Sequence, residues 1–377
     1  MSVRKRTWTT AAGLAREAWI VDYIDQAGER HIQTFSRKKE ADDYHATVRV
    51  DVGKGTHVVP SKSATVAEAA ENWIKRVEAD GRERTTIRQY REHVRLHIVP
   101  RIGATTIAQL NVERIRAFRD DLLAPDTGLS RPMARKVLTS LKSLLKVAQR
   151  GHVTDGVSIK RVKRDERKIE AGTDMPTTGE IKRLVDAAKP GRQRALLLVA
   201  ALTGLRASEL RGLRWADVDL KAATLDVRQR ADRYGTIGTA KTDSSVRRLP
   251  LDQRAVSELR VWRLACPKGE QDLVFPTSTG RVEHHANMLR SLAVVMVAAG
   301  VVDKGGNPKY ALHAFRHFFA SWCLNRKSDG GRELAPIEAQ RMLGHSSIVM
   351  TMDVYGHLFP SRDGGAELAA ASEALFA

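Results

Sequence analysis

Cysteine is scarce in this sequence. Only Cys266 and Cys323 occur among 377 residues, and they lie far apart, outside any spacing that metal ligands adopt. This pattern does not indicate a cysteine metal site. So low a cysteine content favours a reducing, cytoplasmic compartment.

Long apolar runs are also missing. The longest candidate, residues 195–202, falls well short of the roughly 20 residues that span a membrane and is typical of a buried helix. Residues 1–19 carry basic side chains but no apolar stretch of signal-peptide length. The sequence therefore predicts neither a membrane span nor a secretion signal, and a hydrophobic content of 42% excludes wholesale disorder.

Positive charge, in contrast, is abundant. Lys and Arg number 63 against 44 Asp and Glu, which gives a net charge of +19 and a pI near 10.2. Such an imbalance is an argument about binding partners rather than about fold. Nucleic acid is the first expectation, and an anionic membrane surface is the second.

The length of 377 residues predicts two or three domains, of which residues 1–60 form the first. Residues 18–24 and 30–35 are expected to form a hairpin, residues 36–48 a helix, and residues 51–63 a linker. A hairpin on one helix buries little core, so this module is expected to work with a partner. Its basic residues favour DNA over a merely solvated surface; they are Arg4, Lys5, Arg6, Arg16, Arg30, Arg37, Lys38 and Lys39.

Residues 64–150 are predicted to form a compact four-helix bundle. Helix-start signals precede four stretches with apolar residues at helical spacing, namely Thr65, Thr85 or Thr86, Asn111 and Ser130. Many basic residues lie between the apolar positions, which favours a DNA-facing side over simple solvation. Residues 151–175 are strongly charged and poorly periodic, and they are expected to be an interdomain linker.

Residues 176–377 are predicted to form a mainly helical domain with a small antiparallel sheet. The expected strands are 225–229, 236–239 and 246–251, with Lys241 in the turn between the last two. Helices are expected around residues 252–264, 283–299, 313–324 and 336–343. The predicted fold class is therefore multidomain α+β.

Segments 203–210, 313–317 and 343–357 of this last domain suit attack on a phosphodiester. That reaction needs positive charge around the non-bridging phosphate oxygens. Metal ions held by carboxylates usually supply this charge, but no convincing carboxylate constellation accompanies these segments. Arginine can replace the metal, because its planar fork bonds two phosphate oxygens and stays charged.

The arginines of these segments have helpful neighbours. Arg206 follows Gly204 at a helix break, where its side chain can leave the core, and Glu209 three residues later could orient it. Arg316 lies three residues after His313, so on a helix both side chains face the same way.

Tyr355 is the candidate nucleophile. A phenol has a pKa of about 10, so it needs a base or nearby positive charge before it attacks. The leaving alkoxide needs a proton, which a mobile lysine such as Lys241 can deliver. Taken alone, each of these residues fits an ordinary packed or solvated role. The order in which they occur together along the chain is distinctive.

That order resembles the tyrosine recombinase family, the lambda-type phage integrases and their relatives. Thr-Gly-Leu-Arg-Ala-Ser-Glu-Leu at 203–210 resembles the family's first arginine motif. His-Ala-Phe-Arg-His at 313–317 resembles its histidine–x–x–arginine motif, and residues 343–357 resemble its final box. The resemblance covers about residues 175–360.

The resemblance implies a role for each residue. Arg206 and Arg316 would clamp the phosphate, and Tyr355 would be the nucleophile. His313 would assist proton transfer and is the candidate base, and His345 would hydrogen-bond the phosphate.

Lys241 would be the general acid, with Lys221 as its rival. His317 and His357 are favoured as structural residues.

The family also implies a function. The chain would be a site-specific DNA recombinase, an integrase that inserts or excises a mobile element through a 3′-phosphotyrosyl link. This link stores the bond energy, so neither ATP nor metal nor another cofactor is needed. The bundle would bind core-type DNA sites, and the N-terminal module would bind arm-type sites. A homotetramer on paired sites, at the nucleoid of a bacterial cell, is expected, with an excisionase and DNA-bending proteins as accessory partners.

Two other functions compete with this one. A type IB topoisomerase uses similar chemistry but reseals the same strand, and the N-terminal module argues against it. A non-catalytic DNA-binding regulator would not need the complete residue set. Residues 365–377 carry an apolar stripe expected to dock on a neighbouring protomer or on their own domain, namely Leu368, Ala371, Leu375 and Phe376.

Overall fold

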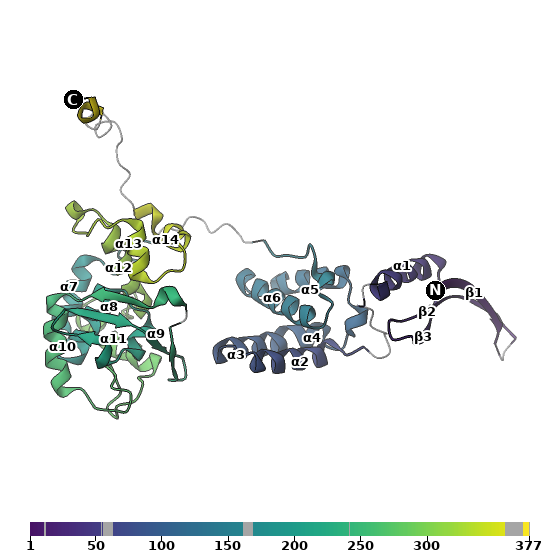
Figure 1. Ribbon diagram of the computed structural model, residues 1–377, viewed down its shortest axis with the longest axis horizontal. Helices are drawn as coiled ribbons and strands as arrows, with labels where there is room; N and C mark the ends of the chain where they lie inside the picture. The colour runs from purple at the N-terminus through teal and green to yellow at the C-terminus, as the bar shows by residue number, and fades with distance from the viewer. Residues whose placement is uncertain are drawn as a thin grey trace. The chain divides into compact units, whose positions relative to one another are not determined.

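The computed structural model describes residues 1–10, 13–53, 55, 63–160, 169–240, 242–358 and 372–376. The chain divides into two compact units, Met1–Arg164 and Asp165–Ala377 (Figure 1). Within the described residues, no helix combines the length and the apolar character needed to cross a membrane.

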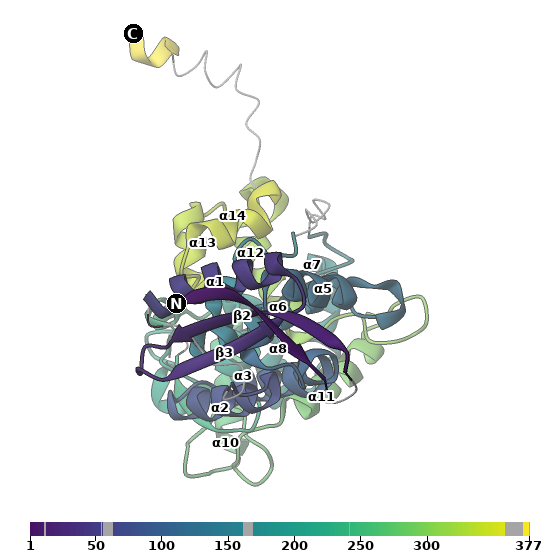
Figure 2. The same ribbon diagram turned by 90° about the vertical axis from the view of Figure 1, so that its right-hand side faces the viewer.

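The first unit begins with a three-stranded antiparallel sheet in the order β1-β2-β3. Its strands are β1 (Ser2–Thr9), β2 (Ala15–Ile24) and β3 (Arg30–Phe35), and α1 (Lys38–Gly53) follows. Figure 2 shows β2 and β3 side by side with α1 along the sheet. The predicted hairpin and helix are confirmed, but β1 was missed because its polar and basic sequence lacks an apolar alternation.

Helix α1 is longer than predicted. It runs to Gly53, so residues 51–53 belong to the helix and not to the expected linker; the rest of that linker lies almost wholly outside the described residues. Val21, Tyr23, Ala41 and Val48 form a small buried core between α1 and one face of the sheet.

The remainder of the first unit is helical and surrounds one hydrophobic core. Its main helices are α2 (Val66–Ala79), α3 (Arg84–His93), α5 (Val112–Leu123) and α6 (Arg131–Val147). A π-helical turn, Val94–Ile98, and the short α4 (Val99–Ile102) continue α3. Trp73, Ile115 and Leu141 are among the side chains fully buried in this core.

Two of the predicted helix starts have the expected capping bonds. The Thr65 hydroxyl accepts a hydrogen bond from the Glu68 amide, and the Asn111 side chain accepts one from the Arg114 amide. Ser130 precedes α6 but makes no side-chain capping bond. Helix α3 begins at Arg84 and not at the predicted threonines.

A buried ion pair joins the N-terminal module to the helical core. Arg150 donates through Nη1 to Asp51 Oδ2 at 3.1 Å, and both residues are less than a tenth exposed. The other terminal nitrogen of Arg150, Nη2, donates to the carbonyl oxygens of Ala108 and Leu110. The C-terminal turn of α1 is therefore fixed to the helices that follow it.

The second unit is mostly helical. The helices α7 (Thr178–Ala187), α8 (Arg192–Thr203) and α9 (Ala207–Gly212) come first. After five short strands follow α10 (Gln253–Ala265), α11 (His285–Ala298), α12 (Leu312–Leu324), α13 (Pro336–Leu343) and α14 (Ile348–Tyr355). Helix α8 is buried almost all round, as its apolar run predicts, and it packs against α10 and α12.

The strands of the second unit form two small antiparallel sheets. One has the order β4-β5-β8 and the other pairs β6 with β7. The bounds are β4 (Val218–Asp219), β5 (Thr224–Val227), β6 (Gln229–Ala231), β7 (Ile237–Thr239) and β8 (Arg247–Pro250). The predicted pairing of the last two strands through a tight turn is wrong, because β7 pairs with β6 and β8 with β5.

Candidate active site

The first arginine motif sits at a sharp break between α8 and α9. Gly204 adopts a left-handed backbone conformation with φ +61°, and a Cβ there would lie 2.4 Å from the Phe319 ring. Only glycine fits this position. The break ends α8 and places Arg206 directly before α9.

Three arginines, which we call the arginine cluster, converge on the C-terminal end of α13. The cluster consists of Arg206, Arg247 and Arg316, which come from three separate elements. Helix α13 ends at Gly344, whose left-handed φ of +64° turns the chain away from the helix axis. Arg247 Nε donates to the Met342 carbonyl (2.7 Å), Arg316 Nη2 to Leu343 (2.5 Å) and Arg206 Nη2 to Gly344 (2.9 Å).

Glu209 holds two members of the cluster together. Its Oε1 accepts from Arg206 at 2.7 Å and its Oε2 accepts from Arg247 at 2.9 Å. Burial alone raises the pKa of Glu209, but the adjacent Arg247 and Arg206 outweigh it, and the net pKa lies below the ordinary value. The predicted contact between Glu209 and Arg206 is confirmed, and Arg247 is an additional partner.

The cluster carries more positive than negative charge. Arg316 is 2% exposed and donates through Nη1 to the Gly204 carbonyl at 2.7 Å. Burial and then the charge of Arg206 lower the pKa of Arg316 to about 9. An anion beside these guanidinium groups would relieve their repulsion, so the site favours a phosphate.

His313 and His345 lie beside the arginine cluster and are held neutral. Burial, followed by the charges of Arg316 and Arg206, lowers the pKa of His345 to about 4. The pKa of His313 is lowered by burial and by the same two arginines. His345 Nδ1 lies 2.9 Å from the hydroxyl of Thr351, which fixes its ring against α14.

Tyr355, at the C-terminal end of α14, is 2% exposed. Burial raises the pKa of its phenol to about 12, although Arg316 opposes the shift. The phenolic oxygen lies 2.6 Å from Nδ1 of His317. The His317 ring in turn packs edge-to-face on His313, with centroids 4.6 Å apart.

The structure therefore gathers five of the six predicted site residues. The five come from the break before α9, from α12, from the turn after α13 and from α14; they are Arg206, His313, Arg316, His345 and Tyr355. The sixth, Lys241, lies outside the described residues.

Arg247 was not expected at this site, and nothing in the sequence distinguishes it from its exposed neighbour Arg248. His317 was expected to be a structural residue. It lies four residues after His313 and so on the same helix face.

The rival lysine, Lys221, lies away from the arginine cluster. It is in the turn between β4 and β5 and lines a hollow together with Arg248 and Arg260. Side chains alternate along a strand, so Arg248 faces this hollow while Arg247 faces Glu209 on the opposite side. Lys221 thus belongs to the sheet face that points away from the arginine cluster.

The chain just after Lys241 approaches the cluster. The carbonyl oxygen of Ser244 would lie 3.1 Å from a Cβ added at Gly344. Ser244 therefore lies close to the end of α13, where the three arginines donate their hydrogen bonds.

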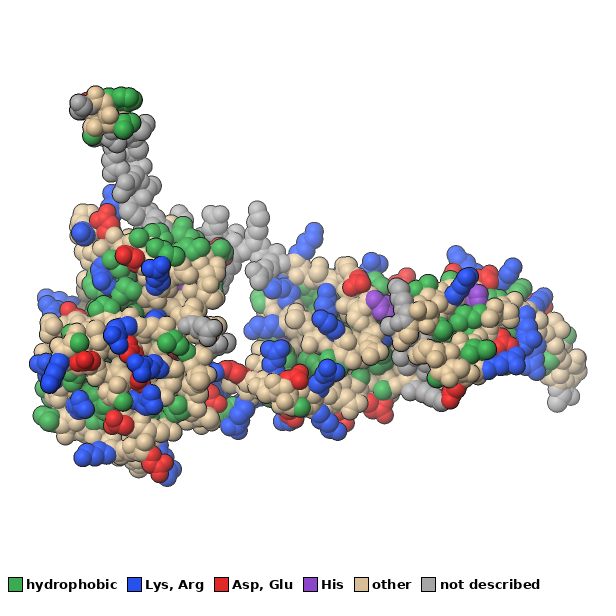
Figure 3. Space-filling view, in the orientation of Figure 1, with side chains coloured by type: hydrophobic (Ala, Val, Ile, Leu, Met, Phe, Trp, Pro, Cys, Tyr) green, Lys and Arg blue, Asp and Glu red, His purple; other side chains and the backbone are tan. Residues whose placement is uncertain are grey.

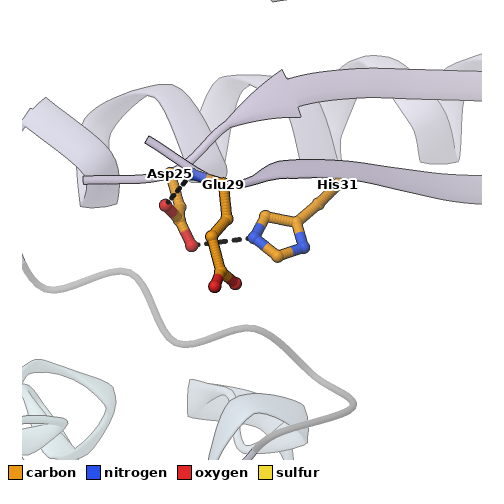
Figure 4. Close-up of side chains that lie close together, drawn as sticks. All are labelled: Asp25, Glu29 and His31. Atoms are coloured by element: carbon orange, nitrogen blue, oxygen red, sulfur yellow. Dashed lines mark hydrogen bonds and ion pairs between the residues drawn. The ribbon is translucent and has the colours of Figure 1, made fainter. Parts of the chain in front are cut away.

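A different group of potential metal ligands occurs in the turn between β2 and β3. The ligand atoms of Asp25, Glu29 and His31 lie within 4.8 Å of one another (Figure 4). Asp25 Oδ1 accepts from the amides of Ala27 and Glu29 at 2.9 Å, and Oδ2 lies 2.7 Å from His31 Nε2. These bonds explain the group as a hairpin turn stabilised by hydrogen bonds to Asp25.

The elements of the second unit thus define a site for transferring a phosphodiester to a tyrosine. Residues 177–362 match the model of the phage integrase family. A "Tyrosine recombinase XerC" of Xanthomonas campestris pv. campestris strain B100 is 30% identical over 263 residues, covering 68% of this chain and 72% of that protein. A "Tyrosine recombinase XerC-like" protein of Caldanaerobacter subterraneus is 26% identical, covering 86% and 87%.

Solved structures have the same fold. The Tn1549 transposon integrase in complex with a circular intermediate DNA is 19% identical, with a TM-score of 0.61 over 83% of this chain and 100% of that chain. A lambda integrase tetramer bound to a Holliday junction is 16% identical, with a TM-score of 0.54 over 90% and 95%. This chain belongs to the phage integrase family of tyrosine recombinases. It is an enzyme of site-specific recombination that cuts and rejoins DNA.

Proposed function

We propose that this recombinase is the integrase of a mobile element and that Tyr355 is its nucleophile. The observation that carries the assignment is the position of the phenol. Tyr355 is buried in the same domain as the arginine cluster, and the charge of Arg316 reaches it. No other tyrosine belongs to the three motif segments.

Each step of the reaction has a residue suited to it. Arg206 and Arg316 bind the non-bridging oxygens, and His345 donates to the same phosphate. The phenolic oxygen of Tyr355 bonds to phosphorus, and the bond from phosphorus to the 5′-oxygen breaks. Lys241 gives a proton to that oxygen. A 3′-phosphotyrosyl link and a free 5′-hydroxyl result.

The second step reverses the first on another strand. The 5′-hydroxyl of a partner strand attacks the phosphotyrosine, the new phosphodiester forms, and Tyr355 regains its proton. Because the link conserves the phosphodiester bond energy, the reaction as proposed needs neither ATP nor metal nor another cofactor.

We assign arm-type DNA binding to the open face of the N-terminal sheet. Val21 and Tyr23 face α1, so their neighbours on β2 face the other way. The register pairs Arg4 with Ile20 and Arg6 with Ala18, which puts both arginines on the open face. Lys and Arg side chains gather over these strands (Figure 3). The predicted four-helix bundle, residues 64–150, binds core-type sites in this proposal.

The assembly is proposed as a homotetramer on paired sites, aided by an excisionase and DNA-bending proteins. One solved structure with a similar fold is a lambda integrase tetramer bound to a Holliday junction, which supports the proposal of a tetramer. In the tail, Leu375 and Phe376 are 78% and 83% exposed. These apolar side chains are suited to docking on a neighbouring protomer. Leu368 and Ala371 lie outside the described residues.

A nicked suicide substrate tests the assignment. Cleavage releases a short fragment, so the covalent protein–DNA adduct accumulates and survives a denaturing gel. We expect the full chain to form the adduct and Tyr355→Phe to form none, with unchanged DNA binding. An adduct in the Tyr355→Phe protein would make another residue the nucleophile.

The same substrate separates the competing functions. A non-catalytic regulator forms no adduct at all. A topoisomerase relaxes supercoiled DNA without a recombination site, whereas the integrase is expected to need one.

A further inference from the structure

His317 is the side chain that contacts the candidate nucleophile. Its Nδ1 lies 2.6 Å from the Tyr355 hydroxyl, well within hydrogen-bond distance. No hydrogen bond between His313 and that hydroxyl occurs among the described residues. His313 instead packs edge-to-face against the His317 ring, with centroids 4.6 Å apart.

The direction of this hydrogen bond follows from the protonation state. Burial, then His313 and Arg316, lower the pKa of His317 to about 4, so the imidazole is neutral at pH 7. A neutral imidazole has one N–H and one acceptor nitrogen. With the proton on Nε2, Nδ1 accepts from the phenolic O–H.

We propose that His317 is a catalytic residue that accepts the phenolic proton of Tyr355 during DNA cleavage. This inference rests on the proposed role of Tyr355 as the nucleophile. It goes beyond that role, because the sequence motifs favour a structural His317 and give proton transfer to His313.

The proton balance of both steps is complete. As the phenolic oxygen bonds to phosphorus, its proton moves to Nδ1 and His317 becomes an imidazolium. The bond from phosphorus to the 5′-oxygen breaks, and the alkoxide takes its proton from Lys241. During religation, His317 returns a proton to the phenolate of Tyr355 and Lys241 is reprotonated by the attacking 5′-hydroxyl.

DNA binding should raise the pKa of His317 and so make it a better base. The groups that act on its ring are Tyr355, His313 and Arg316, with a smaller opposing effect from Asp174. A phosphate bound at the arginine cluster compensates the charge of Arg316, which raises the pKa of His317 towards its ordinary value. The histidine is therefore a weak base without DNA and a better one with the scissile phosphate in place.

His357 provides a matched comparison. It lies two residues after Tyr355, and its Nε2 is 3.1 Å from the carbonyl oxygen of Ile169. A carbonyl oxygen can only accept a hydrogen bond, so His357 donates one to it. This contact is structural and does not involve the phenol. Replacing it changes the same neighbourhood without touching the phenol.

The experiment measures single-turnover cleavage of the suicide substrate across pH, with enzyme in excess. His317→Asn keeps an acceptor near the position of Nδ1 but cannot take up a proton. His317→Ala opens space for added imidazole. Tyr355→Phe and His357→Asn serve as controls, and DNA binding and thermal unfolding are measured for every variant.

We expect His317→Asn to slow cleavage by about 10²- to 10⁴-fold, the usual range for a general base, with unchanged DNA affinity. The acid limb of the pH–rate profile should disappear, and imidazole should restore His317→Ala. His357→Asn should retain the wild-type profile.

Three results would overturn the proposal. One is near-normal cleavage by His317→Asn. The second is slow cleavage by His317→Asn with the acid limb of the pH–rate profile retained. The third is a failure of imidazole to rescue a folded His317→Ala. The second and third results would both mean that His317 contributes only to packing. Failure of the nucleophile assignment is recognised separately, by an adduct in Tyr355→Phe.

Discussion

The charge state of each side chain in the active site follows from its burial. His317 and His345 are held neutral by burial and neighbouring positive charge, with pKa values of about 4. Tyr355 is held protonated, with a pKa of about 12. Without DNA the site is therefore unreactive, because the candidate nucleophile keeps its proton and neither histidine is charged. A bound phosphate compensates the charge of the arginines and so raises the pKa of the two histidines, which makes His317 a better base.

The general acid can be tested against a lysine that the fold places elsewhere. Lys241→Ala should slow cleavage of ordinary DNA by about 10²- to 10⁴-fold. Lys221→Ala should not, because Lys221 lines the hollow beside Arg248 on the outer sheet face. Suicide-substrate cleavage rates measure both.

A 5′-bridging phosphorothiolate decides whether the defect concerns the leaving group. Its sulfur leaves without a proton, so this substrate should restore the rate of Lys241→Ala. A lack of rescue would give the acid role to a different group. His317→Asn should remain slow on the same substrate, because its defect is on the nucleophile side.

Part of the active site could be predicted from residues that are close in sequence, and part could not. Arg206, Glu209 and Gly204 are neighbours in sequence, so local spacing predicts that the glycine breaks the helix and the carboxylate meets the arginine. Arg247 joins Glu209 from 38 residues away. Only the pairing of β8 with β5 decides that Arg247 faces inward and Arg248 outward, and no local pattern contains that information.

The principal element of the site is the C-terminal end of α13. A helix end carries carbonyl oxygens without intrahelical partners and a partial negative charge. Three guanidinium groups satisfy the carbonyls of residues 342–344. The same groups thereby fix the turn that carries His345. The positions of the three guanidinium groups and of His345 are thus set by one set of contacts.

Arg247 should matter through this arrangement, although it is not expected to touch DNA. Arg247→Lys keeps the charge but cannot bond Glu209 and Met342 with one rigid fork. We expect about 100-fold slower cleavage, the scale of a 1 Å misplacement of reacting groups. Arg248→Lys, which is exposed and paired with Asp226, should cleave normally.

Coupling to Glu209 distinguishes positioning from general destabilisation. In a double-mutant cycle on the cleavage rate, Arg247→Lys and Glu209→Gln should be strongly non-additive. Additive effects, or equal defects in Arg247→Lys and Arg248→Lys, would contradict the positioning role. Thermal unfolding of each variant reports the loss of stability separately.

Secondary structure was predicted best where the apolar residues of an element recur at one clear spacing. The buried α8 and the helices α10 to α13 follow from apolar spacing, and their observed bounds differ only slightly from those expected. β1 has no such period, because basic side chains occupy its open face. The strands around Lys241 were located correctly but paired wrongly, since pairing depends on contacts between β5 and β8 that are distant in sequence.

At the scale of the whole molecule, the basic excess is spread over more than one surface. The open face of the N-terminal sheet carries Arg4, Arg6 and Arg16, apart from the arginine cluster of the second unit. Two DNA-binding parts on one chain gain affinity through effective concentration only when both sites lie on one DNA. The charge distribution therefore suits a protein that engages two classes of site.

The Asp51–Arg150 ion pair complicates the obvious test of the N-terminal module. Deleting residues 1–60 removes Asp51 and leaves Arg150 as a buried cation. Breaking such a pair costs about 3–5 kcal/mol, so the truncated protein should unfold at a lower temperature whether or not the module binds DNA. Adding Arg150→Met to the deletion should recover much of that loss, because no unpaired charge remains.

Substitution on the open sheet face avoids this difficulty. The double variant Arg4→Gln and Arg6→Gln should keep its melting temperature, because both side chains are exposed. It should retain core-site footprints and lose those at the second class of sites. If both arginines contact phosphates, the slope of log affinity against log salt should fall by about one for each.

Lys39→Gln, on α1 and so on the other side of the sheet, is the control and should change neither the footprints nor the salt dependence. Identical footprints for the double variant and the full chain would remove the arm-binding assignment, while the assignments of core binding to residues 64–150 and of the nucleophile to Tyr355 would stand.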